Sequence, residues 1–473
     1  MASRDSAAIV LAELRKESQD IYNRIHSIAE DAEFVKQVHQ YYPNLPLLPN
    51  MRCGAWYTDP DIASSECAYF KSTDGHTNNW SFNLRRPNLH ILPLIVQHHG
   101  LILVDSTRAG KRIPDALSKT VPIWCSVINR AFLRRPQSPN FDTWDTTLYT
   151  PPAVVSAQEH NQIEQKLDAW AAELAASFYK LPELQLPLRP IWITPATTTF
   201  PSLSAPTLPF YPIVCLSASK LVADGLERRA NGFAYIQGSG DDHELWSMDL
   251  TPTVFWKNCD VLLQGTRSAL PGLVLSLLPG SDLPRRVAND TLPTPVTHVS
   301  GLLSISSTCT LQSALPFVAS SELAVVWLTS SDPSCLLNAN TIDPSRLLCI
   351  QTPEGKKGQH HFLRTVLPRS MPFIEAQLLR GNKVCIACDT GKDTSVGLCV
   401  AVLTKHFHED GSFNPQKIVL SKTILKTRLQ WIISSYPTAN PSRTTLKRVN
   451  DFLLSPPQCT GSESLSKNQK FTE

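Results

Sequence analysis

The chain has 473 residues, of which 42% are hydrophobic and 18% charged, and its formal net charge is +3. At about 100–200 residues per domain, this length predicts two to four domains with sizeable cores. The small net charge excludes a generally basic nucleic-acid coat, so any contact with nucleic acid must come from local clusters of Lys and Arg.

No run of apolar residues approaches the ~18 needed to span a bilayer. The first residues mix acidic and basic side chains and lack the pattern of a signal peptide. The 12 Cys are irregularly spaced, which favours reduced thiols over a disulfide framework. We therefore expect a cytoplasmic protein, with the nucleus not excluded, that has no membrane contact and no obligate protein partner.

The fold class expected is α/β, with a larger N-terminal α/β domain over residues 1–280. Apolar positions at helical spacing predict one or two helices over residues 5–42. The stretch Leu181–Pro212 contains eight prolines, so we expect an extended connection there. The remaining elements expected in this domain are the strand-like runs Ala55–Tyr57 and Trp80–Leu84, the strands Leu101–Asp105, Ile213–Leu216 and Phe233–Gln237, the helices Asp115–Leu133 (kinked at Pro122) and Ser156–Tyr179, and a helix opened by Gly238–Trp246.

A stretch rich in Pro and loop residues, Pro271–Thr297, predicts a boundary to a smaller α/β domain over residues 298–453. The polar tail from residue 455 to 473 is expected to be disordered. Strands are expected at Gly301–Ile305, Leu323–Trp327, Leu347–Gln351 and Lys383–Ala387, and helices at Met371–Arg380, Val396–Phe407, Lys417–Ser434 and Ser442–Leu453.

The loop Cys388–Ser395, CDTGKDTS, lies between an apolar strand and an apolar helix. Such a loop directs backbone N–H groups and the N-terminal end of the helix dipole at one point, where an anion satisfies them. Gly391 permits the tight backbone. We expect a phosphate site with added contacts from Lys392 and from the hydroxyls of Thr390, Thr394 and Ser395. The alternative is a plain helix N-cap.

This loop resembles the phosphate loop of cysteine-dependent phosphatases, in which Cys is followed by five residues and then Arg. Cys388 occupies the nucleophile position, but Thr394 occupies the Arg position. Without the guanidinium fork, and without an identifiable upstream acid loop, hydrolysis is disfavoured while phosphate binding is retained. Cys385 and Cys388 form a single Cys-x-x-Cys without the second pair that a zinc site requires.

Two further clusters carry charge. The densest basic region follows the strand Leu101–Asp105 and is expected to contact a phosphodiester backbone or a second phosphate, unless it is only a solvated face. It comprises Arg108, Lys111 and Arg112, followed by Arg130, Arg134 and Arg135. The second cluster holds Asp241, Asp242 and Glu244 after two glycines, which suits a Mg²⁺ site or general base as well as it suits a helix start.

Three segments together resemble the initiator tRNA 2′-O-ribosylphosphate transferase family, and the resemblance covers nearly the whole chain. They are residues 103–125 (LVDSTRAGKRIPDALSKTVPIWC), 237–246 (QGSGDDHELW) and 385–397 (CIACDTGKDTSVG). The resemblance implies a pentosyltransferase with a phosphatase-like C-terminal domain. Such an enzyme transfers 5-phosphoribosyl from phosphoribosyl pyrophosphate, normally with Mg²⁺, to the 2′-hydroxyl of the purine at position 64 of initiator tRNA. The modification excludes that tRNA from elongation.

Under this resemblance, Lys392 and the loop around it are expected to hold a donor phosphate, and Asp389 or Asp393 to act as base or Mg²⁺ contact. The basic residues from Arg108 to Arg112 are expected to bind tRNA. Two alternatives stay open: a cysteine-dependent phosphatase acting on protein or RNA, and a tRNA-binding protein without catalysis. The residues expected to bind the donor are Cys388, Thr390, Gly391, Lys392, Thr394 and Ser395.

Overall fold

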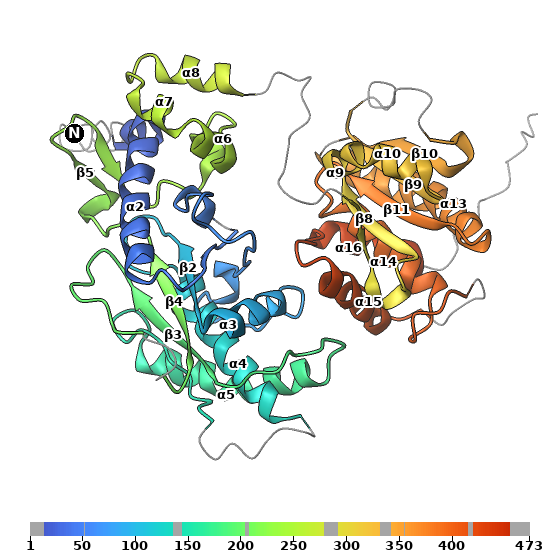
Figure 1. Cartoon of the computed structure of the whole chain (residues 1–473), viewed down its shortest axis with the longest axis horizontal. Helices are drawn as coiled ribbons and strands as arrows, with labels where there is room; N and C mark the ends of the chain where they lie inside the picture. The colour runs from blue at the N-terminus through green and yellow to red at the C-terminus, as the bar shows by residue number, and fades with distance from the viewer. Residues whose placement is uncertain are drawn as a thin grey trace, which may run out of the picture. The chain divides into compact units, whose positions relative to one another are not determined.

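The computed structural model describes residues 14–51, 53–135, 144–203, 208–278, 292–331, 342–353, 355–414 and 420–454. It divides into two compact units, Met1–Arg285 and Arg286–Glu473 (Figure 1). Both units are built on a largely parallel sheet with helices against it, which confirms the expected α/β class.

The sheet of the first unit has four parallel strands in the order β1-β2-β4-β3. Strands β2 and β4 are buried along their whole length, as expected for the centre of a parallel sheet. An antiparallel hairpin, β5-β6, lies outside this sheet. The strands are β1 (Leu47–Pro49), β2 (Leu101–Asp105), β3 (Leu188–Ile193), β4 (Tyr211–Ser217), β5 (Leu226–Arg228) and β6 (Ala234–Ile236).

Helices lie on both faces of this sheet. One face packs through Ile102 and Val104 into a core shared with Ile25 and Ile28 of α2. On the other, α4 packs against β3 and α5 packs against α4. The helices are α2 (Ile21–Tyr41), α3 (Leu92–His98), α4 (Val121–Leu133, preceded by a π-helical turn over Ala116–Thr120), α5 (Ala157–Ala175), α6 (Pro252–Lys257), α7 (Cys259–Gln264) and α8 (Leu270–Leu277).

The second unit has a five-stranded sheet in the order β10-β9-β11-β8-β7, parallel except for β7. Short helices α9 and α10 pack on one face, and α13 and α14 contact the sheet from the other (Figure 1). The strands are β7 (Thr294–Pro295), β8 (Leu303–Ser307), β9 (Leu323–Thr329), β10 (Leu347–Gln351) and β11 (Lys383–Cys388). The helices are α9 (Thr308–Ser313), α10 (Leu315–Ser320), α12 (Gly355–His361), α13 (Leu367–Leu379), α14 (Thr394–His406), α15 (Lys422–Ser435) and α16 (Arg443–Leu454).

Several local expectations were wrong. The Pro-rich stretch contains the strand β3, which includes Pro190 and pairs with β4. The segment 238–246 forms turns and one 3₁₀ turn instead of opening a helix, and Asp242 in it has a left-handed backbone. The run Ala55–Tyr57 lies in a 3₁₀ turn, and Trp80–Leu84 is not a strand. The helix expected over Asp115–Leu133 is present, and Pro122 lies where its π-helical turn Ala116–Thr120 passes into α4.

The tail from residue 455 to 473 lies outside the described residues. Within the described part, the ten cysteines are all free. The helices described there include none long and apolar enough to cross a membrane.

Candidate functional site

The loop 388–395 begins at the carboxyl end of β11, which is hydrogen-bonded to β8 on one side and to β9 on the other. Cys388 is only 4% exposed, and its Sγ lies 3.1 Å from the Ser395 hydroxyl oxygen. Gly391 has a φ of +70°, and a Cβ there would lie 2.9 Å from the Ser307 nitrogen. The strand end and the glycine together fold the loop tightly against β8.

Two carboxylates hold this loop to neighbouring segments. Asp389 accepts hydrogen bonds from the Thr308 hydroxyl at 3.3 Å and the Ser330 backbone N–H at 2.9 Å. Asp393 accepts from the Ser442 backbone N–H at 2.8 Å. Both groups therefore fix the shape of the loop, and a role for either as a base or Mg²⁺ contact stays a prediction.

The first turn of α14 receives no capping bond from the side chain of its N-cap residue, Asp393. Its leading N–H groups have no acceptors within the helix, so they are donors for an anion. Lys392 and Thr394 are half-buried beside them, and the Thr390 hydroxyl accepts from the Lys392 N–H at 3.2 Å. This geometry suits a phosphate group. Thr394 occupies the loop position at which hydrolysis requires an arginine.

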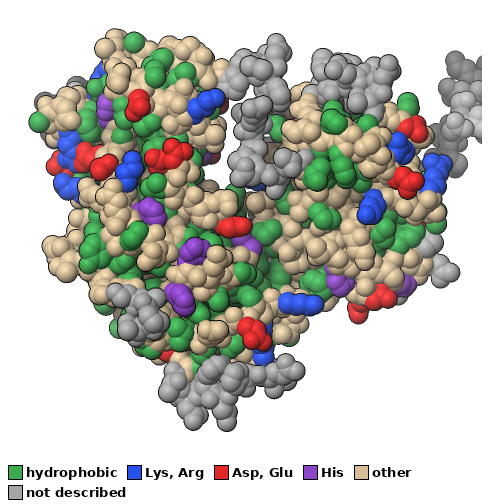
Figure 2. Space-filling view, in the orientation of Figure 1, with side chains coloured by type: hydrophobic (Ala, Val, Ile, Leu, Met, Phe, Trp, Pro, Cys, Tyr) green, Lys and Arg blue, Asp and Glu red, His purple; other side chains and the backbone are tan. Residues whose placement is uncertain are grey.

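The six basic residues expected to contact tRNA fall at two places in the first unit. Arg108, Lys111 and Arg112 are exposed in the loop after β2, where Arg108 pairs with Asp242 at 2.5 Å and Lys111 with Asp115 at 2.6 Å. On the face drawn in Figure 2, Lys and Arg side chains lie singly or beside acidic ones rather than in one basic area.

The second group lies at the far end of α4. Arg130 is paired with Glu164 and Asp168 of α5, and its side chain is 12% exposed. Arg134 pairs with Asp168 at 3.1 Å, while the guanidinium of Arg135 lies over the Phe132 ring. Arg130 and Arg134 thus join α4 to α5, while Arg135 packs on α4 itself. We therefore expect these three residues to contribute less to tRNA binding than the residues of the loop after β2.

A buried polar network lies at the carboxyl ends of β2 and β4. The Ser219 hydroxyl donates to Asp31 at 2.6 Å, lies 2.5 Å from the Ser106 hydroxyl and accepts from the Gly238 N–H. The Tyr235 hydroxyl donates to the other Asp31 oxygen at 2.7 Å. Burial raises the pKa of Asp31 to about 8, and the hydrogen bonds from Ser219 and Tyr235 only partly oppose that rise.

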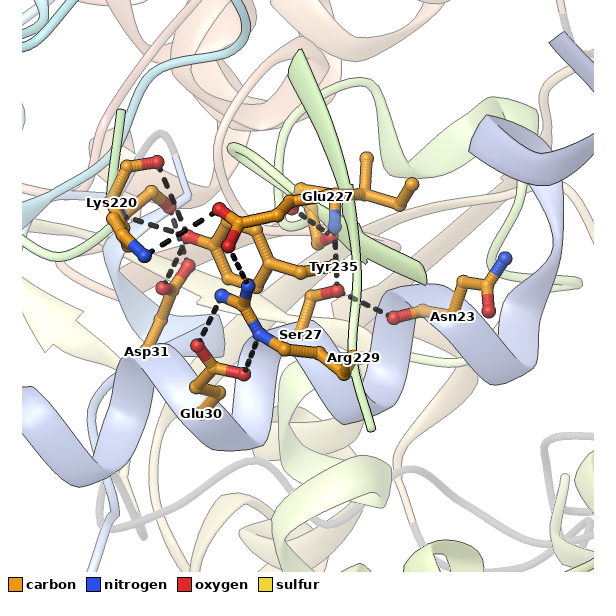
Figure 3. Close-up of polar contacts among 11 residues, drawn as sticks. Asn23, Ser27, Glu30, Asp31, Lys220, Glu227, Arg229 and Tyr235 are labelled. Carbon is orange, nitrogen blue, oxygen red and sulfur yellow. Dashed lines mark hydrogen bonds and ion pairs between the residues drawn. The ribbon is translucent and has the colours of Figure 1, made fainter. Parts of the chain in front are cut away.

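Helix α2 is fastened to the hairpin through side chains that lie along one of its faces (Figure 3). Asn23 accepts from the Ala234 N–H at 3.0 Å, and Ser27 accepts from the Ile236 N–H at 2.8 Å. One turn further, Glu30 receives two hydrogen bonds from Arg229. This contact fixes the position of α2 over the end of the sheet.

A pocket opens beside this fastened helix, with a cavity volume of about 160 Å³. Its lining includes Arg24 from α2, Arg108 from the loop after β2, Gly238, and the carboxylates Asp241 and Asp242. The sequence did not indicate Arg24, since its partner Ser239 lies 215 residues away along the chain.

Glu244 does not join the two aspartates. Its side chain is 78% exposed and lies 4.0 Å from the ring of His243. Among the described residues, no group of three or more His, Cys, Asp or Glu side chains is arranged to hold a metal ion. Any cation at Asp241 and Asp242 would therefore need further ligands from water or substrate.

Comparison with known proteins supplies the family. The model of the Rit1 N-terminal domain matches residues 14–279, and that of the Rit1 DUSP-like domain matches residues 346–453. The tRNA A64-2′-O-ribosylphosphate transferase of Saccharomyces cerevisiae is 32% identical, over 93% of this chain and 94% of its own. An uncharacterised protein of Schizosaccharomyces pombe is 34% identical, over 92% of this chain and 94% of its own.

Solved phosphatase structures match about a third of the chain. Human DUSP28 is 18% identical, covers 33% of this chain and 89% of its own, and gives a TM-score of 0.24. The PTP-2 phosphatase of Cydia pomonella is 14% identical, covers 34% and 88%, and gives a TM-score of 0.26.

Proposed function

This chain belongs to the Rit1 family, and we propose that it is a pentosyltransferase that adds a ribosyl phosphate group to the 2′-oxygen of a tRNA nucleotide. The observation that carries the proposal is the relationship to the yeast enzyme along 93% of the chain. The acceptor is the purine at position 64 of initiator tRNA, the donor is phosphoribosyl pyrophosphate with Mg²⁺, and the reaction takes place in the cytoplasm.

In this reaction the 2′-hydroxyl oxygen bonds to C1 of the donor ribose while the bond from C1 to pyrophosphate breaks. Pyrophosphate leaves with the bonding electrons, and the hydroxyl proton passes to a base. The sugar becomes cationic as pyrophosphate departs, so nearby anionic groups stabilise the transition state. Mg²⁺, for which Asp389, Asp393, Asp241 and Asp242 are the candidate contacts, would offset part of the negative charge of the departing pyrophosphate.

Lys392 and the first-turn N–H groups of α14 are proposed to hold a phosphate of the donor. Support comes from the start of α14, which the side chain of its N-cap residue does not cap, and from the half-buried residue Lys392, two positions before the helix. Thr394 in place of Arg leaves the loop without the group that would stabilise a transferring phosphoryl, which favours binding over hydrolysis. Lys111 and Arg112 are proposed to contact tRNA phosphates, because both are exposed in the loop after β2.

The test is a transfer assay with ribose-labelled phosphoribosyl pyrophosphate and initiator tRNA. We expect label on the tRNA at position 64 and stoichiometric release of pyrophosphate. Lys392→Ala is expected to lose transfer while keeping most tRNA binding. Binding of tRNA without transfer at any Mg²⁺ concentration would instead indicate a non-catalytic binder, and hydrolysis of p-nitrophenyl phosphate through Cys388 would indicate a phosphatase.

A further inference from the structure

We propose that the pocket at Arg24 and Arg108 binds the diphosphate group of the donor together with a divalent cation. The inference rests on the transfer reaction proposed above and adds the place where the leaving group is held. It assigns to the first unit a phosphate site separate from the loop 388–395.

Arg24 is the central observation. Its guanidinium lines the pocket, donates to the backbone oxygens of Ser18 at 2.5 Å and Ser239 at 3.2 Å, and lies over the Trp246 ring. Among the described residues, Arg24 forms no ion pair with a carboxylate. The nearby Arg108, Arg229 and Arg267 each do. Asp241 and Asp242 lie close enough to attract the guanidinium electrostatically but form no direct ion pair with it. A half-buried cation held in one orientation in this way is suited to an anionic ligand.

Arg108 lies at the same pocket, and a ligand could replace its present partner, Asp242. Its side chain is 73% exposed and pairs only with Asp242, itself 50% exposed. Exposed ion pairs of this kind contribute little, typically ~0–1 kcal/mol, so a ligand phosphate can replace the carboxylate at small cost. Two guanidinium groups would then face one ligand.

The carboxylates of Asp241 and Asp242 decide the class of ligand. A lone phosphate would meet both negative charges as well as the arginines. A diphosphate that carries Mg²⁺ matches both signs, because Mg²⁺ binds one or two carboxylates together with phosphate oxygens and water. The pocket residues therefore fit a cation-bound diphosphate better than a single phosphate or an RNA backbone.

The floor of the pocket is fixed by close backbone contacts. A Cβ on Gly238 would lie 2.6 Å from the Thr107 carbonyl oxygen, and one on Gly225 would lie 2.4 Å from the Ala109 Cβ. The Gln237 amide donates to the carbonyl oxygens of Thr107, Arg108 and Lys111, which ties the two loops together. The site lies beyond the carboxyl ends of parallel strands, where open α/β sheets bind their ligands.

The test is calorimetric titration of the full chain with inorganic pyrophosphate and Mg²⁺. Arg108→Ala and Arg24→Lys are expected to weaken binding at least about tenfold, with unchanged thermal unfolding for the exposed Arg108. The matched control is Arg228→Ala, an arginine on β5 that is 77% exposed and lies outside the pocket lining.

A second pair of titrations tests the cation. Without Mg²⁺, Asp242→Asn should bind pyrophosphate more tightly than wild type, since one repelling charge is gone; with Mg²⁺ it should bind more weakly. Undetectable pyrophosphate binding by wild type, or loss on Lys392→Ala with none on Arg108→Ala, would overturn the proposal. Pyrophosphate binding at this pocket without any transfer to tRNA would refute the proposed transferase function and leave the pocket assignment standing.

Discussion

Replacing Asp31 by Asn tests the buried network in the first unit. The carboxyl has a pKa of about 8 in the folded chain, against about 3.9 for an unperturbed Asp, so the folded state binds the proton more tightly. Stability is therefore lost as pH rises through the window from about 4 to 8. Between pH 6 and 8, Asp31 is already ionised in the unfolded chain, whereas in the folded chain it becomes half ionised. The free energy of unfolding therefore falls by about 2 kcal/mol over this range.

Hydrogen exchange followed by mass spectrometry measures this loss locally, in peptides from α2 and β6, after correction for the pH dependence of intrinsic exchange. The opening free energy of these amides should fall by about 2 kcal/mol between pH 6 and 8 in wild type and much less in Asp31→Asn. Glu33→Gln, at an exposed position on the same helix, should retain the wild-type fall. Equal pH profiles for wild type and Asp31→Asn would refute the assignment of a protonated Asp31.

Other substitutions test separate contacts. Gly238→Ala should destabilise the first unit by about 1–3 kcal/mol, seen as a lower melting temperature, because φ is +69° and the Cβ has no room. Arg112→Ala should weaken tRNA binding and lower its salt slope by about 1, whereas Arg130→Ala should mainly lower stability, by about 1–3 kcal/mol, because its guanidinium is engaged with α5. Cys388→Ser should keep transfer within about threefold of wild type, because the sulfur lies buried against Ser395 and is not expected to act as a nucleophile.

Elements with a strong local pattern were predictable from the sequence. The apolar run before Cys388 and the apolar helix after Ser395 place a loop between β11 and α14, with ends within a residue or two of those expected. Gly391 adopts the positive φ that its position in a tight loop suggested. These features depend on residues that are close along the chain, so they can be predicted from a single sequence.

Features set by distant contacts were not predictable. Strand β3 contains Pro190, which argues locally against a strand, yet its pairing with β4 outweighs that preference. Arg24 occupies a helix position with no distinguishing pattern, and its contact with the turn at Ser239 depends on the fold. The segment 238–246 carries acidic residues typical of a helix start. It stays in turns because Gly238 packs closely against Thr107 and Gly240 against Trp56.

The fastening of α2 to β6 has a geometric basis. Four residues of helix rise about 6.0 Å, and two residues of strand rise about 6.6 Å, so side chains at i and i+4 of a helix can meet alternate amides of a strand. Asn23 and Ser27 do this with Ala234 and Ile236, and the helix thereby occupies the edge where a third strand would pair. The two spacings match over about one helical turn. The two hydrogen bonds therefore fix the position of the helix along the strand. A shift by one residue would break both bonds and carry Arg24 away from Ser239.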